Sequence, residues 1–82
     1  MFNLSEAKMD EEYIIKEISG TREQIIYLQN IGIIEGKEIS IIGLGAFTNT
    51  LVVQVGNFAY HLNHDAVKRI MVEEKTKVLK KK

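Results

Sequence analysis

The two histidines of this chain are the residues with the clearest capacity for metal chemistry. His61 and His64 are three residues apart, and Asp65 follows directly. Imidazole nitrogens and a carboxylate can bind a divalent transition metal, so these residues are weak candidates for a metal site. The alternative places His61 on the exposed face of a strand and His64 in a polar turn. We favour the alternative, because three potential ligands make a thin site.

Other groups that could bind ions or catalyse a reaction lack the required spacing. Asp10, Glu11 and Glu12 are rich in oxygen, but consecutive side chains point in different directions, which favours a solvated turn. Gly43 and Gly45 suggest a phosphate loop, but no third glycine follows at the spacing of a dinucleotide fingerprint. Cysteine is absent, and the serines lie in no nucleophile-elbow context. The sequence predicts a non-enzyme that requires no cofactor, with weak binding of ferrous iron or another divalent metal left open.

Length and charge exclude further classes of function. The chain has 82 residues, which make one domain with a small core and little room for a catalytic cleft. Eleven basic and eleven acidic side chains give a formal net charge of zero, which disfavours nucleic-acid binding. The sequence shows neither a signal peptide nor a stretch of apolar residues long enough to span a membrane. We therefore expect a cytoplasmic protein.

The chain is organised around residues 28–36, where an apolar helix end meets two glycines. With Gly32 as the C′ residue of a helix, Ile33 becomes C″ and Leu28 becomes C3, and a Schellman motif pairs apolar side chains at these two positions. Gly36 suits the third position of a type II turn, which requires a positive φ. The sequence predicts a helix before this segment and strands after it.

One helix is predicted, and it starts at a capping box over residues 21–24. Its buried face is expected to hold apolar residues at three-residue steps, widened by two neighbours: Ile25, Leu28 and Ile31, with Ile26 and Tyr27. Its polar face, which carries Arg22 and Glu23, is either solvated or part of a partner-binding surface.

Segments rich in β-branched and aromatic residues predict strands at 13–18, 38–42, 50–55, 58–62 and 70–72. A Gly-Asn pair at 56–57 predicts a hairpin whose return strand places Phe58, Tyr60 and Leu62 on one side. Residues 43–49 are expected to form a long exposed loop, and residues 4–8 one helical turn. The pattern predicts a mainly β fold, a small antiparallel barrel of about five strands with one inserted helix and a short helical turn before the last strand.

The ordered set of these residues resembles the ferrous-iron transport protein A (FeoA) family. The resemblance is carried by Leu28, Gly32 and Gly36, and it extends from Leu4 and residues 13–18 before the helix to Leu62, Ile70 and Val72 near the end. It implies the SH3-like barrel of the FeoA domain. In the family the first helical turn usually leads into a glycine, which residues 9–12 replace here, so we expect a different turn at this point.

The resemblance also implies a function, that of an accessory module of bacterial ferrous iron uptake acting on the cytosolic GTP-binding region of the membrane transporter FeoB. The predicted loop and the polar helix face supply candidates for this contact: Leu44, Phe47, Thr48, Asn49, Arg22 and Glu23. Phe47 and Phe2 are the aromatic residues expected to be exposed, and most of the others are assigned to the core. Tyr27 and Asn63 stand where basic residues are common in the family.

Two other functions stay open. The same barrel resembles the C-terminal domain of iron-dependent repressors, which implies a transition-metal-binding or metal-responsive regulatory domain. A weaker alternative is nucleic-acid binding through the lysine-rich residues 75–82. We expect this segment to be a disordered tail that follows a domain of residues 1–74.

Overall fold

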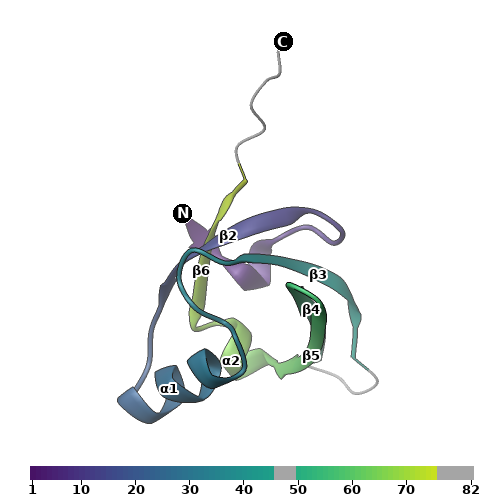
Figure 1. Cartoon of the computed structure of the whole chain (residues 1–82). Coiled ribbons are helices and arrows are strands. Elements are labelled where there is room, and N and C mark those ends of the chain that lie inside the picture. Colours follow the sequence, from purple (N-terminus) through teal and green to yellow (C-terminus); the bar gives the residue numbers. More distant parts are fainter. Residues whose placement is uncertain (46–49, 76–82) are drawn as a thin grey trace.

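Six antiparallel strands form one curved sheet in the computed structural model, which describes residues 1–45 and 50–75. The strands are β1 (Phe2–Asn3), β2 (Glu12–Ile18), β3 (Glu38–Leu44), β4 (Thr50–Val55), β5 (Phe58–Asn63) and β6 (Ile70–Glu74), and the helices are η1 (Leu4–Glu6), α1 (Arg22–Asn30) and α2 (His64–Val67). Their order in the sheet is β1-β6-β2-β3-β4-β5. Figure 1 shows the sheet curling around the centre of the molecule, with α1 and α2 at the same end. The predicted mainly β, antiparallel architecture is confirmed.

The strand that the sequence does not predict is β1, which pairs with β6 through Phe2 and Val72. The Phe2 ring packs edge-on against Tyr13, with the ring centroids 5.5 Å apart. The expectation of an exposed Phe2 is therefore wrong, because the pairing of β1 holds this ring against the core.

The core is apolar, and each of the strands β2 to β6 contributes to it. Its members are Leu4, Tyr13, Ile15, Ile18, Leu28, Ile33, Ile39, Ile41, Val53, Val55, Leu62, Val67, Ile70 and Val72. Within the described residues no polar or charged side chain is buried. The charged groups of this part of the chain are therefore on the surface, and the one phenol in the core, that of Tyr13, accepts a hydrogen bond from the Lys8 N–H.

A bulge in β2 sets which of its side chains face the core. The pairing of β2 with β6 shifts between Ile15 and Glu17, which leaves Lys16 as the extra residue. The extra residue changes the phase of the inward and outward alternation. As a result Ile18 is buried with Ile15, and Glu17 stays exposed.

A second bulge lies in β3, whose pairing with β4 shifts between Ile41 and Gly43. The strand continues past the bulge to Leu44, and the Gly45 N–H donates to the Thr50 carbonyl at 3.0 Å. The prediction of a loop over residues 43–49 is wrong for its first residues, because a bulge accommodates the glycine within a paired strand. Residues 46–49 and 76–82, which include the predicted loop tip and most of the predicted tail, lie outside the described residues.

The helix end at Gly32 is confirmed as a Schellman motif. The Ile33 N–H donates to the Leu28 carbonyl at 2.9 Å, and the Gly32 N–H donates to the Gln29 carbonyl at 3.0 Å. Gly32 has a φ of +97°, and both members of the expected hydrophobic pair, Leu28 and Ile33, are buried. The motif ends α1 and turns the chain back toward the sheet.

Two further turns use a positive φ. The Lys37 N–H donates to the Ile34 carbonyl at 3.2 Å, and Gly36, third in this turn, has a φ of +91°, as a type II turn requires. Before β2, Asp10 has a φ of 66°, and its N–H donates to the Ile41 carbonyl at 2.8 Å. Aspartate tolerates this left-handed conformation better than most residues, so Asp10 supplies the turn without a glycine.

The predicted capping box at the start of α1 is present. The Gln24 N–H donates to the Thr21 hydroxyl at 3.2 Å, and the Thr21 N–H donates to the Gln24 side-chain oxygen at 2.8 Å. Ile26 and Tyr27, however, are 42% and 60% exposed, so the prediction that they widen the buried stripe is wrong. The reason is geometric, since they lie about 100° and 200° around the helix axis from Ile25, and only one stripe of this helix meets the sheet.

Candidate functional site

The structure does not assemble the candidate metal ligands into a site. His61 is exposed on β5, and His64 is the exposed first residue of α2. The Asp65 carboxylate instead accepts a hydrogen bond from the Arg69 guanidinium at 2.9 Å. Within residues 1–45 and 50–75, no three or more His, Cys, Asp or Glu residues are placed to hold a metal ion together.

Of the three acidic residues at positions 10–12, Glu12 belongs to an exposed network of ion pairs. The Lys75 ammonium lies 2.8 Å from the Glu38 carboxylate and 3.3 Å from the Glu12 carboxylate. The hydrogen bonds to Glu38 and Glu12 raise the pKa of Lys75 above its ordinary value. In this way Lys75 links the end of β6 to β2 and β3, which gives Glu12 and Glu38 a structural role.

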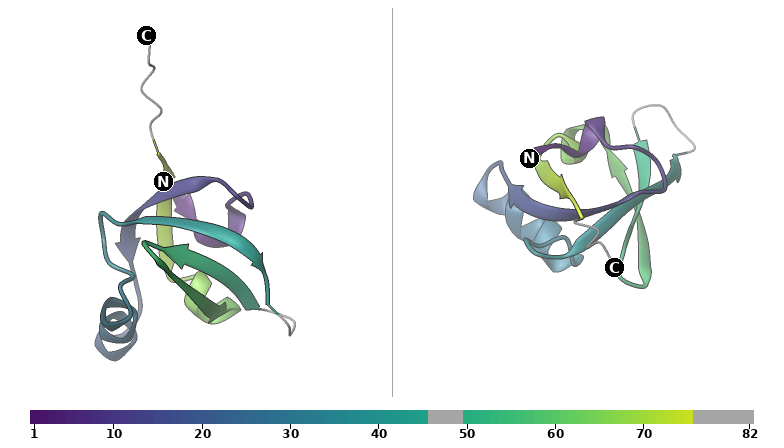
Figure 2. Two further views of the ribbon diagram at one scale, coloured as in Figure 1. Left: turned by 45° about the vertical axis from the view of Figure 1, so that its right-hand side comes forward. Right: turned by 90° about the horizontal axis from the view of Figure 1, so that it is seen from above.

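The candidate partner-binding residues divide into two places. Leu44 is 73% exposed at the end of β3, and Arg22 and Glu23 are exposed in the first turn of α1. Figures 1 and 2 show α1 and this end of β3 on opposite sides of the molecule. Phe47, Thr48 and Asn49 lie outside the described residues. A single compact contact therefore does not include both Leu44 and α1.

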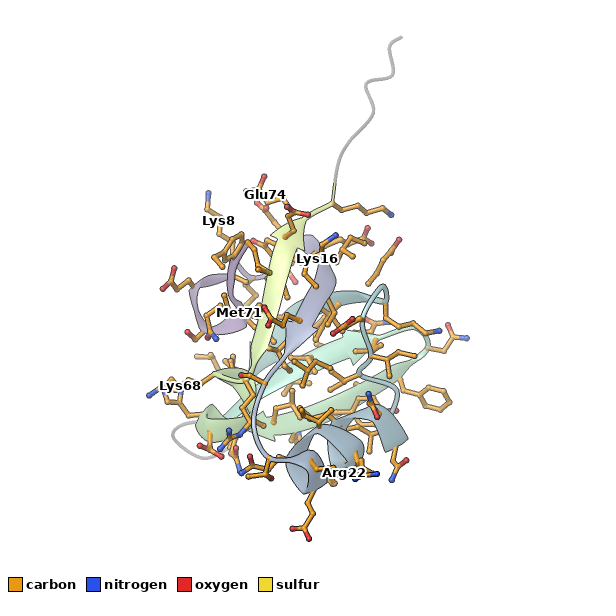
Figure 3. All side chains as sticks on the ribbon, turned by 90° about the vertical axis from the view of Figure 1, so that its left-hand side faces the viewer. Lys8, Lys16, Arg22, Lys68, Met71 and Glu74 are labelled. Carbon is orange, nitrogen blue, oxygen red and sulfur yellow. The ribbon has the colours of Figure 1, made fainter. Side chains whose placement is uncertain are left out.

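The more developed of the two places is a groove of 270 Å³ between α1 and α2, which we call the helix groove. Its lining residues are Glu23, Gln24, Tyr27, Leu28, Asn63, Asp65, Ala66 and Arg69. Asn63 positions the α2 side, because its side-chain oxygen accepts a hydrogen bond from the Ala66 N–H at 2.8 Å. In Figure 3, Arg22 lies on α1 at the opposite end of the molecule from Lys8, Lys16 and Glu74.

The helix groove has an apolar wall and a mainly acidic rim. Tyr27 and the neighbouring Ile26 present apolar surface to solvent, although water-exposed positions of a helix are normally polar. Asp65 and Arg69 neutralise each other, whereas Glu23 has no ion pair with a described residue. Tyr27 and Asn63 both line this groove. It therefore suits a partner with an apolar side chain next to a basic one.

Sequence reasoning assigned Tyr27 and Ile26 to the core and so missed their exposure. One signal could have found it, because residues 25–28 are all apolar and occupy every side of the helix. A short helix packed on one sheet cannot bury all sides, so some of these side chains must face solvent.

A curved antiparallel sheet with one helix inserted after its first long strand defines an SH3-like barrel, and comparison with known proteins identifies its family. The model of the FeoA domain matches residues 2–74. The chain therefore belongs to the FeoA domain family. No curated protein matches the chain in sequence.

Three solved structures illustrate the similarity. The zinc complex of Stenotrophomonas maltophilia FeoA, described as an SH3 domain protein, is 22% identical with a TM-score of 0.75, and the match covers 89% of this chain and 91% of that one. ScaR with bound Cd²⁺ is 25% identical with a TM-score of 0.79, covering 92% of this chain. A manganese-dependent transcriptional repressor is 18% identical with a TM-score of 0.80, covering 89% of this chain. The present chain spans 35% of the length of ScaR and 41% of that repressor.

The described part of the chain has no helix of the length and apolar character needed to cross a membrane.

Proposed function

We propose that this protein is a cytoplasmic, non-catalytic accessory module of ferrous iron transport and that it acts on the GTP-binding region of the transporter FeoB. Membership of the FeoA domain family supports the iron-transport role. The S. maltophilia FeoA structure, which is similar over almost its whole length, is described in connection with activation of ferrous iron transport. A core without charged side chains, and charged groups confined to the surface of the described residues, favour a binding module.

The observation that carries the proposal is the exposed Tyr27 beside the helix groove. An aromatic side chain that lines a groove and is 60% exposed is typical of a binding hot spot, since its burial by a partner is favourable. Glu23 adds an acidic group at the rim. We expect FeoB to supply an apolar side chain for the groove and a basic side chain for Glu23.

Substitution of Tyr27 tests this contact. We expect Tyr27→Ala to weaken binding of the soluble FeoB GTP-binding domain about tenfold or more, because truncation of an aromatic anchor costs well over 1 kcal/mol. Glu23→Lys should also weaken binding of the FeoB domain at low salt, because the new lysine repels the basic side chain of the partner. Isothermal titration calorimetry measures both effects.

Ile42→Ala is the control, because Ile42 is an exposed apolar residue on β3, outside the helix groove. The Ile42→Ala protein should bind the FeoB domain with the affinity of the unsubstituted protein. Equal binding by Tyr27→Ala and Ile42→Ala would exclude the helix groove as the contact, and absence of binding by the unsubstituted protein would exclude this region of FeoB as the partner.

A metal-responsive function is the second candidate, and the likeness to ScaR with bound Cd²⁺ favours it. If this chain binds a divalent ion through His61 and His64, added Zn²⁺ should shift the imidazole and backbone amide resonances of both residues in NMR spectra. Replacement of both histidines by alanine should remove the shifts. Unchanged spectra at several equivalents of Zn²⁺ would reject this candidate.

A further inference from the structure

Strand β5 forms an open edge of the sheet. It is last in the strand order, and its six residues pair with β4 without a register shift. In a hairpin with a two-residue loop, the residues that flank the loop form a hydrogen-bonded pair, and hydrogen-bonded and non-hydrogen-bonded pairs then alternate. Val55 and Phe58 flank the loop, so the backbone groups of Ala59 and His61 point away from β4.

This edge lacks three of the features that protect edge strands in natural proteins. Natural edges carry lysine, proline or a bulge, which prevent pairing with another strand. β5 reads Phe-Ala-Tyr-His-Leu-Asn and has none of these. Within residues 1–45 and 50–75, no backbone group outside the sheet bonds to the backbone of Ala59 or His61. The opposite edge, β1, has only two residues.

A second groove, of 360 Å³, lies at the hairpin end of this strand, and we call it the edge groove. It is lined by Asn30, Ile31, Gly32, Lys37, Val55, Gly56, Asn57, Phe58 and Tyr60. Phe58 is 66% exposed, and its ring centroid lies 6.5 Å from that of Tyr60. Lys37 is the one charged residue of the lining, and it forms no ion pair with a described carboxylate. The edge groove shares no residue with the helix groove.

We propose that β5 binds an extended segment of a protein partner, which joins the sheet as a further strand, places an apolar side chain against Phe58 and Tyr60, and brings a carboxylate to Lys37. The backbone of Ala59 and His61 supplies the hydrogen bonds, as in other complexes formed by strand addition. The inference goes beyond the proposed function, because it concerns a different surface and does not depend on FeoB.

The charge of the edge groove selects this occupant. A second copy of β5 has no acidic residue to place near Lys37. The lysine-rich residues 75–82 of this chain would bring further positive charge to it. An acidic, extended segment from another protein can form hydrogen bonds with the unpaired backbone of β5 and an ion pair with Lys37.

The test is NMR titration with a capped synthetic peptide that alternates valine and threonine and carries one aspartate. We expect the largest amide shifts at Ala59, His61 and Lys37. A second peptide, N-methylated at alternate residues so that it cannot donate to the edge, should bind at least about tenfold more weakly. Equal binding by the two peptides, or no binding at millimolar concentration, would overturn the proposal.

Substitutions in the protein, in β5 and at Lys37, test the same contact. Because the His61 N–H points away from β4, His61→Pro removes an edge donor and keeps the ladder to β4. This substitution should lower the affinity for the peptide about tenfold. The His61→Thr protein, which keeps the N–H, should bind the peptide as the unsubstituted protein does. Lys37→Glu should reverse the preference to a peptide that carries lysine in place of aspartate.

One outcome in solution would contradict the choice of occupant. If His61→Pro dissociates a dimer seen by sedimentation, β5 pairs with a second copy. If His61→Pro fails to fold, the comparison of the two peptides on the unsubstituted protein still decides whether edge hydrogen bonds are used. Because the peptide is not FeoB, the result is independent of the FeoB titration.

Discussion

Leu28→Ala is expected to destabilise the protein by about 2–5 kcal/mol, the range for leucine truncation in a packed core. Leu28 is 1% exposed, and it is the one fully buried side chain of α1. It also forms the hydrophobic pair of the Schellman motif with Ile33. Its truncation therefore leaves a cavity and weakens the attachment of the whole helix. Urea unfolding followed by circular dichroism measures the effect, and a lowering of the melting temperature by about 10 °C or more should accompany it.

The neighbouring residue supplies the control. Tyr27 is larger than Leu28 but 60% exposed, so Tyr27→Ala should change the free energy of unfolding by less than about 0.5 kcal/mol. The two substitutions thus separate stability from partner binding, because Tyr27→Ala should lose binding and keep the fold. Equal destabilisation by both would contradict the burial pattern of α1.

Gly32→Ala is expected to destabilise the protein by about 1–2 kcal/mol, the cost of a left-handed conformation for a residue with a Cβ atom. Gly32 has a φ of +97°, and an added Cβ would meet only the Tyr60 hydroxyl at 3.9 Å, an ordinary contact. The cost therefore comes from the backbone and not from a collision. Chemical denaturation gives the difference in unfolding free energy.

Gly43→Ala is the matched control, because Gly43 lies in β3 without a positive φ and an added Cβ would meet nothing within 4 Å. Its stability should be unchanged or slightly higher, since alanine restricts the unfolded chain more than glycine does. A Gly32→Ala protein as stable as Gly43→Ala would show that the Schellman turn does not need its glycine.

Local sequence rules predicted the parts of this fold that depend on a few adjacent residues. The capping box at Thr21 and the Schellman turn at Gly32 each require particular residue types at fixed spacing, and both form as predicted. The hairpin at 56–57 belongs to the same group. These features depend on short-range hydrogen bonds, which the sequence specifies directly.

Features that depend on pairing between distant segments were not predictable in the same way. The bulges at Lys16 and Ile42 arise from the register with β6 and β4. The two-residue strand at Phe2 exists only because β6 offers it an edge. Phe58 alternates correctly with Tyr60 along β5, but it lies at the hairpin end, where the core no longer covers it. The alternation of residues along a strand indicates which face of the sheet a side chain lies on, but it does not indicate how deeply that side chain is buried.

The candidate site was predictable only in part. The sequence placed Arg22 and Glu23 on an accessible helix face, and both are exposed there. It could not identify the helix groove, because the groove forms where α1 meets α2, and these segments are more than thirty residues apart in sequence. The partner role of this face stays a prediction.

The most direct test of the central claim is an NMR titration of the isotopically labelled protein with the soluble GTP-binding domain of the cognate FeoB. We predict amide shifts clustered on the exposed face of α1 at Arg22, Glu23, Ile26 and Tyr27, continuing onto α2, and we predict that Tyr27→Ala greatly weakens them. Absence of shifts at saturating FeoB domain, or shifts that avoid both helices, would contradict the claim that this FeoA domain acts on FeoB through its helix groove.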